Sequence, residues 1–353
     1  MAGKAESILE HDPVTFEVVR SALYFICAEM KSVIMRTSFS PLLSLSADLS
    51  CALLDTEGRV IAQGNDIPVH LGAATFTARA IFDKFPVAGW RPGDGVITND
   101  PYSGGTHLPD MSLLTPVFAG QTLLGFALSR VHWPDVGGSA RGSSSVSDEI
   151  LKEGLRIPPL RIIKQGAICE DALALILANV RVPKDREGDF RAALAGHHRA
   201  ESRLQDLAAK YAPATILSVM VDSRAYSRRL AEARIGILPD AVMMHEERLD
   251  GDGVDPNAAP LVRVTITKTG AHLRFDFTGS DPCVRGPVNA PIAVTSSAVY
   301  YTVLAFAGGI SHRIRGFMKT SKSSSRRAAS SMRPILHRLS EPTRKPRTVL
   351  SIS

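Results

Sequence analysis

The stretch MSLLTPVFAGQTLLGFALSRVHW occupies residues 111–133 and contains two runs of apolar and β-branched residues around Ala119-Gly120-Gln121. Such runs flanking a glycine turn are typical of a β-hairpin. Upstream, SCALLDTEGRVIAQ (50–63) predicts a second hairpin around its DTEG turn. Downstream, LVRVTITKTGAHLRFDFTG (261–279) predicts a third around Lys268-Thr269-Gly270. We therefore expect mixed sheets built largely from hairpins.

Helical patterns separate these hairpins. Asp12 and Pro13 are of the residue types preferred at an N-cap and at the first helical position, and apolar residues follow at helical spacing as far as Ile34. LGAATFTARAIFDKF (71–85) predicts another helix, and residues 171–240 predict a helical segment. Because strands and helices do not alternate in a regular βαβ order, the fold class is expected to be α+β.

The same patterns suggest an organisation along the chain. We expect an N-terminal α+β domain over residues 1–170, the helical segment over 171–240, and an incomplete domain over 241–310 that contains a β-hairpin and a buried helix. Residues 286–311 carry no charged side chain, but their Asn, Thr, Ser, Gly and Pro content favours a core helix over a membrane span. Residues 311–353 are rich in Ser and Arg, lack a hydrophobic period, and are expected to be disordered.

Charge and cysteine content exclude several classes of protein. The formal net charge is +6, yet residues 311–353 contribute +10 and residues 1–310 therefore −4. A mildly acidic body, and a basic tail with Phe317 as its one aromatic residue and no aromatic series for base stacking, argue against nucleic-acid binding. The four cysteines are widely spaced and form no CxxC pair, so no disulfide framework is expected (Cys27, Cys51, Cys169 and Cys283). The polar start of the chain does not resemble a secretory signal, and together with the absence of a disulfide framework this leads us to expect a cytoplasmic location.

One loop concentrates groups that can bind a metal. The sequence NDPYSGGTHLPDM (99–111) places His107 three residues before Asp110 within a segment that glycine and proline keep out of helical structure. His132 ends the second strand of the hairpin, which folds back and brings it beside this loop. Two imidazoles and one carboxylate would then converge with coordination positions left open. Taken singly, each of these residues is more often structural than a metal ligand, since a histidine after a strand and an Asp beside Pro are common in ordinary turns.

Other candidates are weaker. His197 and His198 lie on a charged helical segment and are expected on its solvated face. Ser143-Ser144-Ser145 lacks the GxSxG context of a nucleophilic serine. No GxxxxGK[ST] sequence occurs, so ATP, if it is used, is not expected to bind this chain through a P-loop.

Several motifs resemble the hydantoinase B/oxoprolinase family in order and spacing. The resemblance covers about residues 10–310 and is carried by these stretches: DPVTFEVVRSAL (12–23), GDGVITNDPYSGGTHLPDM (93–111), HWPDVGGSARGSSS (132–145), EILKEGLRIPPLRIIKQG (149–166), DREGDFRAALAGHHRAESRL (185–204) and FDFTGSDPCVRGPVNAP (275–291). The family includes the B component of ATP-dependent hydantoinases, the C-terminal half of 5-oxoprolinase and the α subunit of acetone carboxylase.

The resemblance implies a B-type component of an ATP-dependent cyclic-amide hydrolase. A hydantoinase A-type partner would bind ATP and activate a small cyclic amide such as 5-oxoproline or a hydantoin, and this chain would complete the ring opening. An acetone-carboxylase-like α subunit and a truncated, catalytically silent member are the alternatives.

The resemblance also implies site residues. His107, Asp110 and His132 would bind a divalent metal, with Mn, Fe and Zn equally suited to these ligands. Asp135 or Asp100 would orient a water or support a ligand histidine, and His70 would either act on the substrate or serve as a core residue.

Two departures from the family pattern have consequences. Many members carry an acidic residue in an ER-x-D-F-S motif, which in the carboxylase supplies a further metal ligand, whereas SLSADLS (44–50) has Leu45 and Ser46 there and retains Asp48. The site is therefore expected to have three ligands, to bind the metal more weakly, or to differ in its choice of metal. The family match is expected to stop near Gly309, as it would after a truncation or a frameshift.

Overall fold

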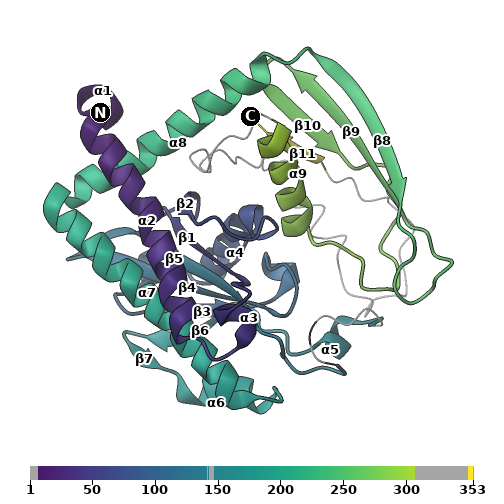
Figure 1. The fold of residues 1–353 in the computed structure, drawn as a ribbon, viewed down its shortest axis with the longest axis horizontal. Helices are drawn as coiled ribbons and strands as arrows, with labels where there is room; N and C mark the ends of the chain where they lie inside the picture. The colour runs from purple at the N-terminus through teal and green to yellow at the C-terminus, as the bar shows by residue number, and fades with distance from the viewer. Residues whose placement is uncertain (1–6, 141, 143–146, 307–348, 353) are drawn as a thin grey trace.

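A seven-stranded antiparallel sheet forms the centre of the larger part of the protein (Figure 1). The computed structural model describes residues 7–140, 142, 147–306 and 349–352. The strand order is β2-β1-β5-β4-β3-β6-β7. The strands are β1 (Leu49–Leu54), β2 (Val60–Gln63), β3 (Gly95–Thr98), β4 (Asp110–Ala119), β5 (Thr122–His132), β6 (Leu160–Lys164) and β7 (Ala167–Ile168).

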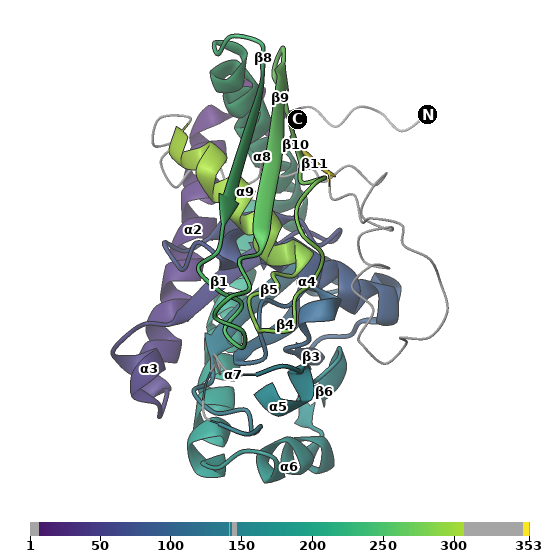
Figure 2. The same ribbon diagram turned by 90° about the vertical axis from the view of Figure 1, so that its right-hand side faces the viewer.

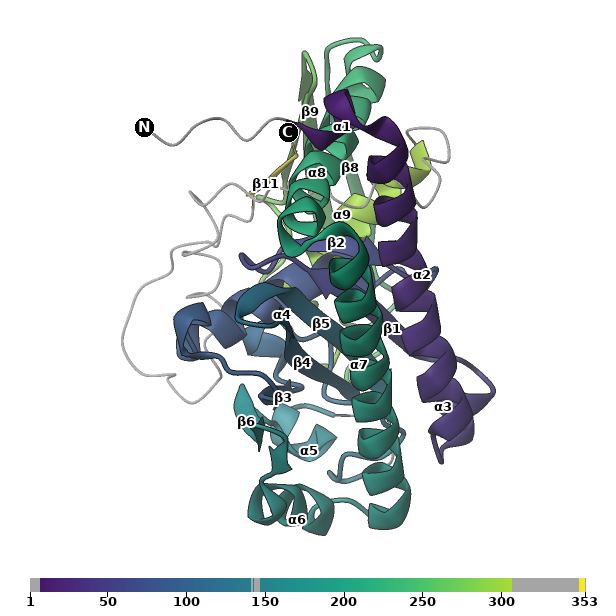
Figure 3. The same ribbon diagram turned by 90° about the vertical axis from the view of Figure 1, so that its left-hand side faces the viewer.

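Helices cover both faces of this sheet. The helices α2 (Pro13–Thr37) and α7 (Pro183–Tyr211) run side by side over one face (Figure 3). The main core lies between them and alternate strand residues such as Leu53, Leu113 and Val131. On the opposite face α4 (His70–Lys84) packs on the intervening strand positions together with Trp90, which makes a second core. The two-residue repeat of the strands therefore supplies both cores.

A second, smaller sheet lies at the far end of α8 (Pro213–Gly236). Its strand order is β11-β10-β9-β8, from β8 (Ala241–Arg248), β9 (Leu261–Thr269), β10 (His272–Asp276) and β11 (Val349–Ile352). The helix α9 (Ile292–Phe306) packs on this sheet and also reaches α4 (Figure 2). At that contact the Gly72 amide donates to the Ser297 hydroxyl at 3.0 Å. The short elements are α1 (Ile8–His11), α3 (Pro41–Ser44), η1 (Val87–Gly89), η2 (Pro101–Ser103), α5 (Ile150–Glu153) and α6 (Glu170–Ala178).

Most of the expected elements are present. The α+β fold class is confirmed, as are the three hairpins and the first helix, where the Asp12 carboxylate accepts from the Thr15 amide at 3.0 Å. Residues 292–306 of the uncharged stretch form α9, with Ser296 and Ser297 fully buried on its inner side, and residues 307–311 lie outside the described residues. Within the described residues, no helix has the length and apolar character needed to cross a membrane.

One element was not expected, the strand β8, whose Met, Glu and Arg content is not typical of a strand. Two expectations need correction or qualification. Residues 349–352 pair with β10, contrary to the disorder expected for 311–353; the remainder of that segment lies outside the described residues. The expected boundary between 1–170 and 171–240 stays a prediction, although α7 packs directly on α2 and β4.

Candidate metal centre

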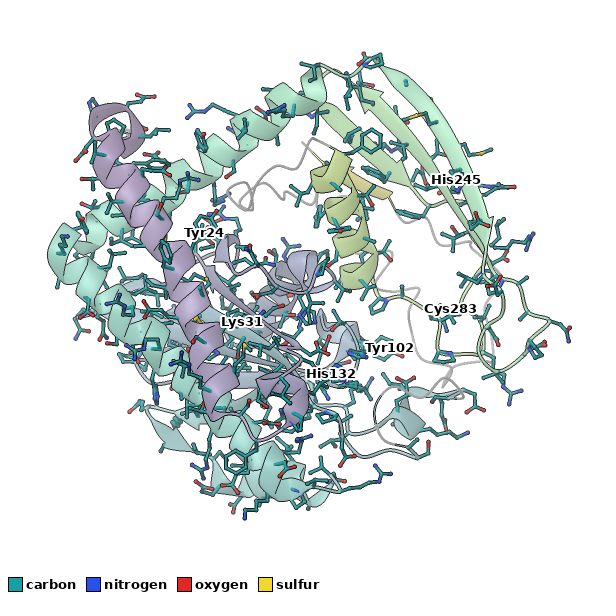
Figure 4. The ribbon with its side chains drawn as sticks, in the orientation of Figure 1. Tyr24, Lys31, Tyr102, His132, His245 and Cys283 are labelled. Atoms are coloured by element: carbon teal, nitrogen blue, oxygen red, sulfur yellow. The ribbon has the colours of Figure 1, made fainter. Side chains whose placement is uncertain are left out.

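Strand pairing brings the three candidate ligands together. Asp110 begins β4, His132 ends β5, and the two are register partners in the hairpin. His107 Nε2 lies 3.1 Å from Asp110 Oδ1, and His132 Nδ1 lies 3.4 Å from the same oxygen. One potential ligand atom from each residue lies within 4.8 Å of the others, a spacing compatible with a shared metal ion. His132 is labelled in Figure 4, among the side chains of the larger part of the protein.

Glycine gives the preceding loop its path. Gly104 has φ of +84°, and a Cβ there would lie 2.4 Å from the backbone carbon of Phe76 in α4. Only glycine combines that conformation with so close an approach. The Gly104 carbonyl accepts a hydrogen bond from the Thr77 hydroxyl at 2.7 Å, which ties the loop to α4. The turn before His107 is thus fixed by backbone packing on a helix.

The two oxygens of Asp110 have different surroundings. The Thr106 hydroxyl donates to Oδ2, and His70 Nε2 lies 3.1 Å from it. Oδ1 is buried and has no aligned hydrogen-bond donor, although His107 and His132 lie nearby. Burial is the largest single influence on the pKa of Asp110 and raises it. The three imidazoles together outweigh burial and hold this pKa well below its usual range.

This arrangement fits a divalent cation. A buried carboxylate oxygen without an aligned donor is costly unless a positive charge faces it. Two imidazole nitrogens converge on the same point, and a divalent ion between the three groups would satisfy the oxygen and both nitrogens together. The donor set of nitrogen and oxygen suits Mn, Fe(II) or Zn.

Asp48 approaches the same centre from the residue before β1. Its Oδ2 lies 3.7 Å from His132 Nδ1, and its carbonyl accepts from the His132 amide at 3.1 Å. By contrast, Leu45, at the position where the resemblance led us to look for an acidic residue, is 81% exposed. The carboxylate that the sequence retains is therefore close to the candidate ligands.

His70 supports the cluster from α4. It is buried, and its two ring nitrogens contact Asp110 Oδ2 and the Ser50 hydroxyl, the latter at 2.7 Å. Burial is the main reason that the pKa of His70 is lowered, so a neutral ring is favoured. Of the two roles expected from the sequence, this environment supports the core role over direct action on a substrate.

Asp100 and Asp135 are engaged elsewhere. The Asp100 carboxylate accepts from the Tyr102 amide at 3.0 Å and the Ser103 hydroxyl at 3.1 Å, so it shapes the loop. The Asp135 carboxylate forms an ion pair with Arg181 at 2.9 Å and accepts from the Gly137 amide at 3.2 Å. Within the described residues, neither carboxylate is hydrogen-bonded to a candidate metal ligand. A role in orienting a water therefore stays a prediction for both.

His197 corrects an expectation. Instead of facing solvent it is buried beneath α7, with ring nitrogens 2.7 Å from the Thr115 hydroxyl and 2.9 Å from the Ser129 hydroxyl. Burial lowers the pKa of His197 to about 3. The charged residues around it occupy the opposite side of the helix, where His198 is exposed as expected. Ser143-Ser144-Ser145 lies outside the described residues.

Thr106 and Ser50 were missed as residues that support the centre, through Asp110 and His70 respectively. Ser50 follows Asp48 by two positions where the chain enters β1, so both face the same side of the sheet, a signal that alternation alone could have given. Glu153 ends α5 near His107, whose charge acts on its carboxyl group. Burial raises the pKa of Glu153, and His107 opposes that rise.

Known proteins share both this sequence pattern and this fold. The sequence profile of the hydantoinase B/oxoprolinase family matches residues 12–332. The chain belongs to this family. The resemblance expected from the motifs is thereby confirmed, and the match extends beyond Gly309, where it was expected to stop.

Relatives in the family differ in what is known of them. The chain is 32% identical over 302 residues to an uncharacterized protein of Methanocaldococcus jannaschii, covering 83% of this chain and 52% of that protein. It is 30% identical over 302 residues to a Pseudomonas sp. (strain NS671) protein provisionally named as the B component of a D-/L-hydantoinase, with coverage of 83% and 51%. It is 29% identical over 311 residues to 5-oxoprolinase of Dictyostelium discoideum, and the match covers 86% of this chain and 24% of that protein. The chain therefore spans about half the length of these relatives, or less.

Two solved structures share the fold. An ATP-dependent caprolactamase from Pseudomonas jessenii superposes with a TM-score of 0.76 at 28% identity, covering 84% of this chain and 51% of that one. A nucleotide-free acetone carboxylase structure gives a TM-score of 0.74 at 18% identity, covering 90% and 44%. The second likeness shows the fold alone.

Proposed function

We propose that this chain is the B-type component of an ATP-dependent cyclic-amide hydrolase that opens 5-oxoproline or a hydantoin. Relatives with names of this type, and an ATP-dependent caprolactamase of the same fold, support the proposal. The observation that carries it is the convergence of His107 and His132 on the buried Oδ1 of Asp110. The carboxylase alternative rests on the fold alone and is not favoured.

The chain's own residues prepare this centre for a metal ion. Thr106 and His70 hold Oδ2 of Asp110, so that Oδ1 stays directed at the two ligand histidines. The His107 side chain is 37% exposed, whereas Asp110 is 2% exposed, so a substrate would approach from the His107 side. When bound, a divalent Mn, Fe or Zn ion would polarise the activated carbonyl group and lower the pKa of a bound water.

ATP would bind a partner protein. The sequence contains no P-loop, which agrees with a division of labour in which a hydantoinase A-type partner takes up ATP and phosphorylates the carbonyl oxygen of the ring. The B-type chain would receive the activated ring at the candidate metal centre and complete hydrolysis. The proposed setting is a hetero-oligomer in the cytoplasm.

The test is ring opening by the complete assembly. The chain would be combined with an A-type partner, ATP and either 5-oxoproline or hydantoin, and the ring-opened product measured by mass spectrometry. Activity that needs both proteins and ATP, disappears in His107→Ala and persists in His198→Ala supports the proposal. Exposed His198 is a matched control, because the same substitution there leaves the centre intact. A metal-loaded assembly that opens neither ring would point to the silent alternative.

A further inference from the structure

Arg130 lies one row of the sheet away from the candidate ligands. It precedes His132 by two positions on β5, so both side chains point to the same face of the sheet. Ser112 on β4 and Ser50 on β1 are the register partners of Arg130. In the next row Asp110 on β4 pairs with His132. The row of Arg130 therefore adjoins the row that carries two of the three candidate ligands.

The Arg130 guanidinium joins two strands to a helix. Its Nε donates to the Ser112 hydroxyl at 3.0 Å, and its Nη2 donates to the Thr77 hydroxyl of α4 at 2.7 Å. The residue is 2% exposed, so these bonds are shielded from water. The planar guanidinium holds its donors in a rigid fork, which fixes Thr77 relative to β4 and β5.

Thr77 carries this connection to the metal-binding loop. Its hydroxyl has one hydrogen, and the Arg130 N–H occupies one of its acceptor positions. The hydroxyl in turn donates to the Gly104 carbonyl at 2.7 Å, a shorter contact than the 3.1 Å to the Ala73 carbonyl in its own helix. A charged donor polarises the hydroxyl group and strengthens its onward hydrogen bond. Arg130, Thr77 and Gly104 therefore form a continuous relay of hydrogen bonds from β5 to the loop.

The relay reaches the loop close to His107. Gly104 precedes His107 by three residues and packs so tightly on α4 that a Cβ would lie 2.6 Å from the Thr77 amide nitrogen. His132, two residues beyond Arg130, lies at the other end of the relay. The relay thus connects the backbone segments that carry the two imidazoles, whose ring centroids are 5.0 Å apart.

Stability alone does not account for Arg130. Its Nη1 is buried without a hydrogen-bond partner. Among the residues that the structure describes, no carboxylate forms an ion pair with it, although Asp110 acts on it electrostatically. Arg186, which is equally buried, pairs with Asp189 at 2.9 Å. Because a buried charge with only neutral partners is costly, an apolar side chain would serve a purely structural role as well.

We propose that Arg130 and Thr77 are positioning residues that set the spacing of His107 and His132 for metal binding, an inference that rests on the metal centre of the proposed function and not on its substrate. Both act through the backbone that carries the ligands and not as ligands themselves. Metal–ligand distances are held to within about 0.2 Å, so a small displacement of the loop relative to β5 is enough to weaken binding.

The experiment measures Mn(II) binding to the purified full chain and its variants by isothermal titration. Thr77→Val keeps the shape of the side chain and removes the hydroxyl, so the affinity should fall by about 10-fold, at the lower end of the losses typical for groups that support metal ligands. Thr77→Ser retains the hydroxyl and should bind Mn(II) as the parent does. Thr302→Val is the matched control, because the Thr302 hydroxyl donates to the Ala298 carbonyl within α9 at 2.8 Å, and it should also bind as the parent does.

Arg130→Lys tests the guanidinium itself. Lysine keeps the charge, so a change in Mn(II) affinity reports geometry and not electrostatics, and a single ammonium group lacks the fork that reaches Ser112 and Thr77 together. We expect a loss of about 10-fold in affinity. The EPR spectrum of the bound Mn(II) should change as well, because its zero-field splitting depends on the arrangement of the ligands. A loss of stability that leaves the ligands in place would not alter that spectrum.

Parent-like Mn(II) affinity and EPR spectra in Thr77→Val and Arg130→Lys would overturn the positioning role, and so would equal losses in Thr77→Val and Thr77→Ser. If Arg130→Lys does not fold, the comparison of the two Thr77 variants decides alone. A parent that binds Mn(II) but opens neither ring would contradict the proposed function, while the Mn(II) affinities would still decide the positioning role. A folded parent that binds no Mn(II) would overturn this inference.

Discussion

Asp110 and His132 are register partners at the open end of the β4–β5 hairpin, and His132 Nδ1 lies 3.4 Å from Asp110 Oδ1. The pairing of two long strands therefore fixes the distance between two candidate ligands that are far apart in sequence. The neighbouring strand β1, which pairs with β5 on its other side, brings Asp48 to the same place. The centre is built on rigid strands, and one loop adds the third ligand.

Thr106 is expected to control metal affinity through Asp110. Thr106→Val removes the hydroxyl that donates to Oδ2 and leaves the side-chain volume almost unchanged. Loss of such a supporting hydrogen bond typically weakens metal binding by about 10–100-fold. Isothermal titration with Mn or Zn should show this weakening, and Thr122→Val, at an exposed position at the start of β5, should bind as the parent does. Equal affinity in all three proteins would contradict the supporting role.

Asp48 is expected to contribute to the same site. Asp48→Asn removes a negative charge 3.7 Å from His132 Nδ1 without changing the shape of the side chain. We expect a lower metal affinity than in the parent, but a smaller loss than in His107→Ala, because Asp48 lies at the margin of the cluster. Exposed Asp206→Asn is the charge-matched control. An affinity for Asp48→Asn equal to that of the control would restrict the site to three ligands.

Gly104 is expected to be essential for the loop. Gly104→Ala places a Cβ 2.4 Å from the Phe76 backbone at φ of +84°, so the strain should cost roughly 1–3 kcal/mol and displace His107. Gly120→Ala, at φ of +59° with open space around it, tests positive φ without the clash. Urea unfolding should show a larger loss of stability for Gly104→Ala than for Gly120→Ala. Metal titration should show weaker binding for Gly104→Ala and parent-like binding for Gly120→Ala. Similar behaviour of the two variants would rule out the packing argument.

His197 is expected to couple stability to pH. Its folded pKa is about 3 against an ordinary value of 6.5, so the unfolded chain binds a proton that the folded chain does not. The stability contribution is therefore fully present above pH 6.5 and is lost as the pH falls towards 3, by roughly 4–5 kcal/mol. His197→Gln should flatten the dependence of the unfolding free energy on pH in that range, whereas His198→Gln should not. An unchanged slope in His197→Gln would disprove the coupling.

Local patterns predicted the parts of the site that depend on neighbouring strands. The hairpin of residues 111–133 has a short glycine turn and two long apolar strands, so its ends meet and His132 returns to Asp110. Gly104 and Pro109 likewise signalled a fixed loop around His107. These features are encoded within short stretches of chain.

Features set by distant contacts escaped prediction. The residues of β8, AVMMHEER, have helical propensity, and only pairing with β9 makes them a strand. His197 is buried because its helix lies on β4 and β5, which no pattern within the helix specifies. Thr106 gains its role from its hydrogen bond to Asp110, and a single sequence does not record such a contact.

The metal content of the purified full chain tests the central claim most directly. After incubation with Mn, Fe(II) or Zn and removal of free ions, elemental analysis should find about one divalent ion per chain. The ion should be lost in His107→Ala and retained in His198→Ala. A folded parent that retains none of the three ions would contradict a metal centre at His107, Asp110 and His132.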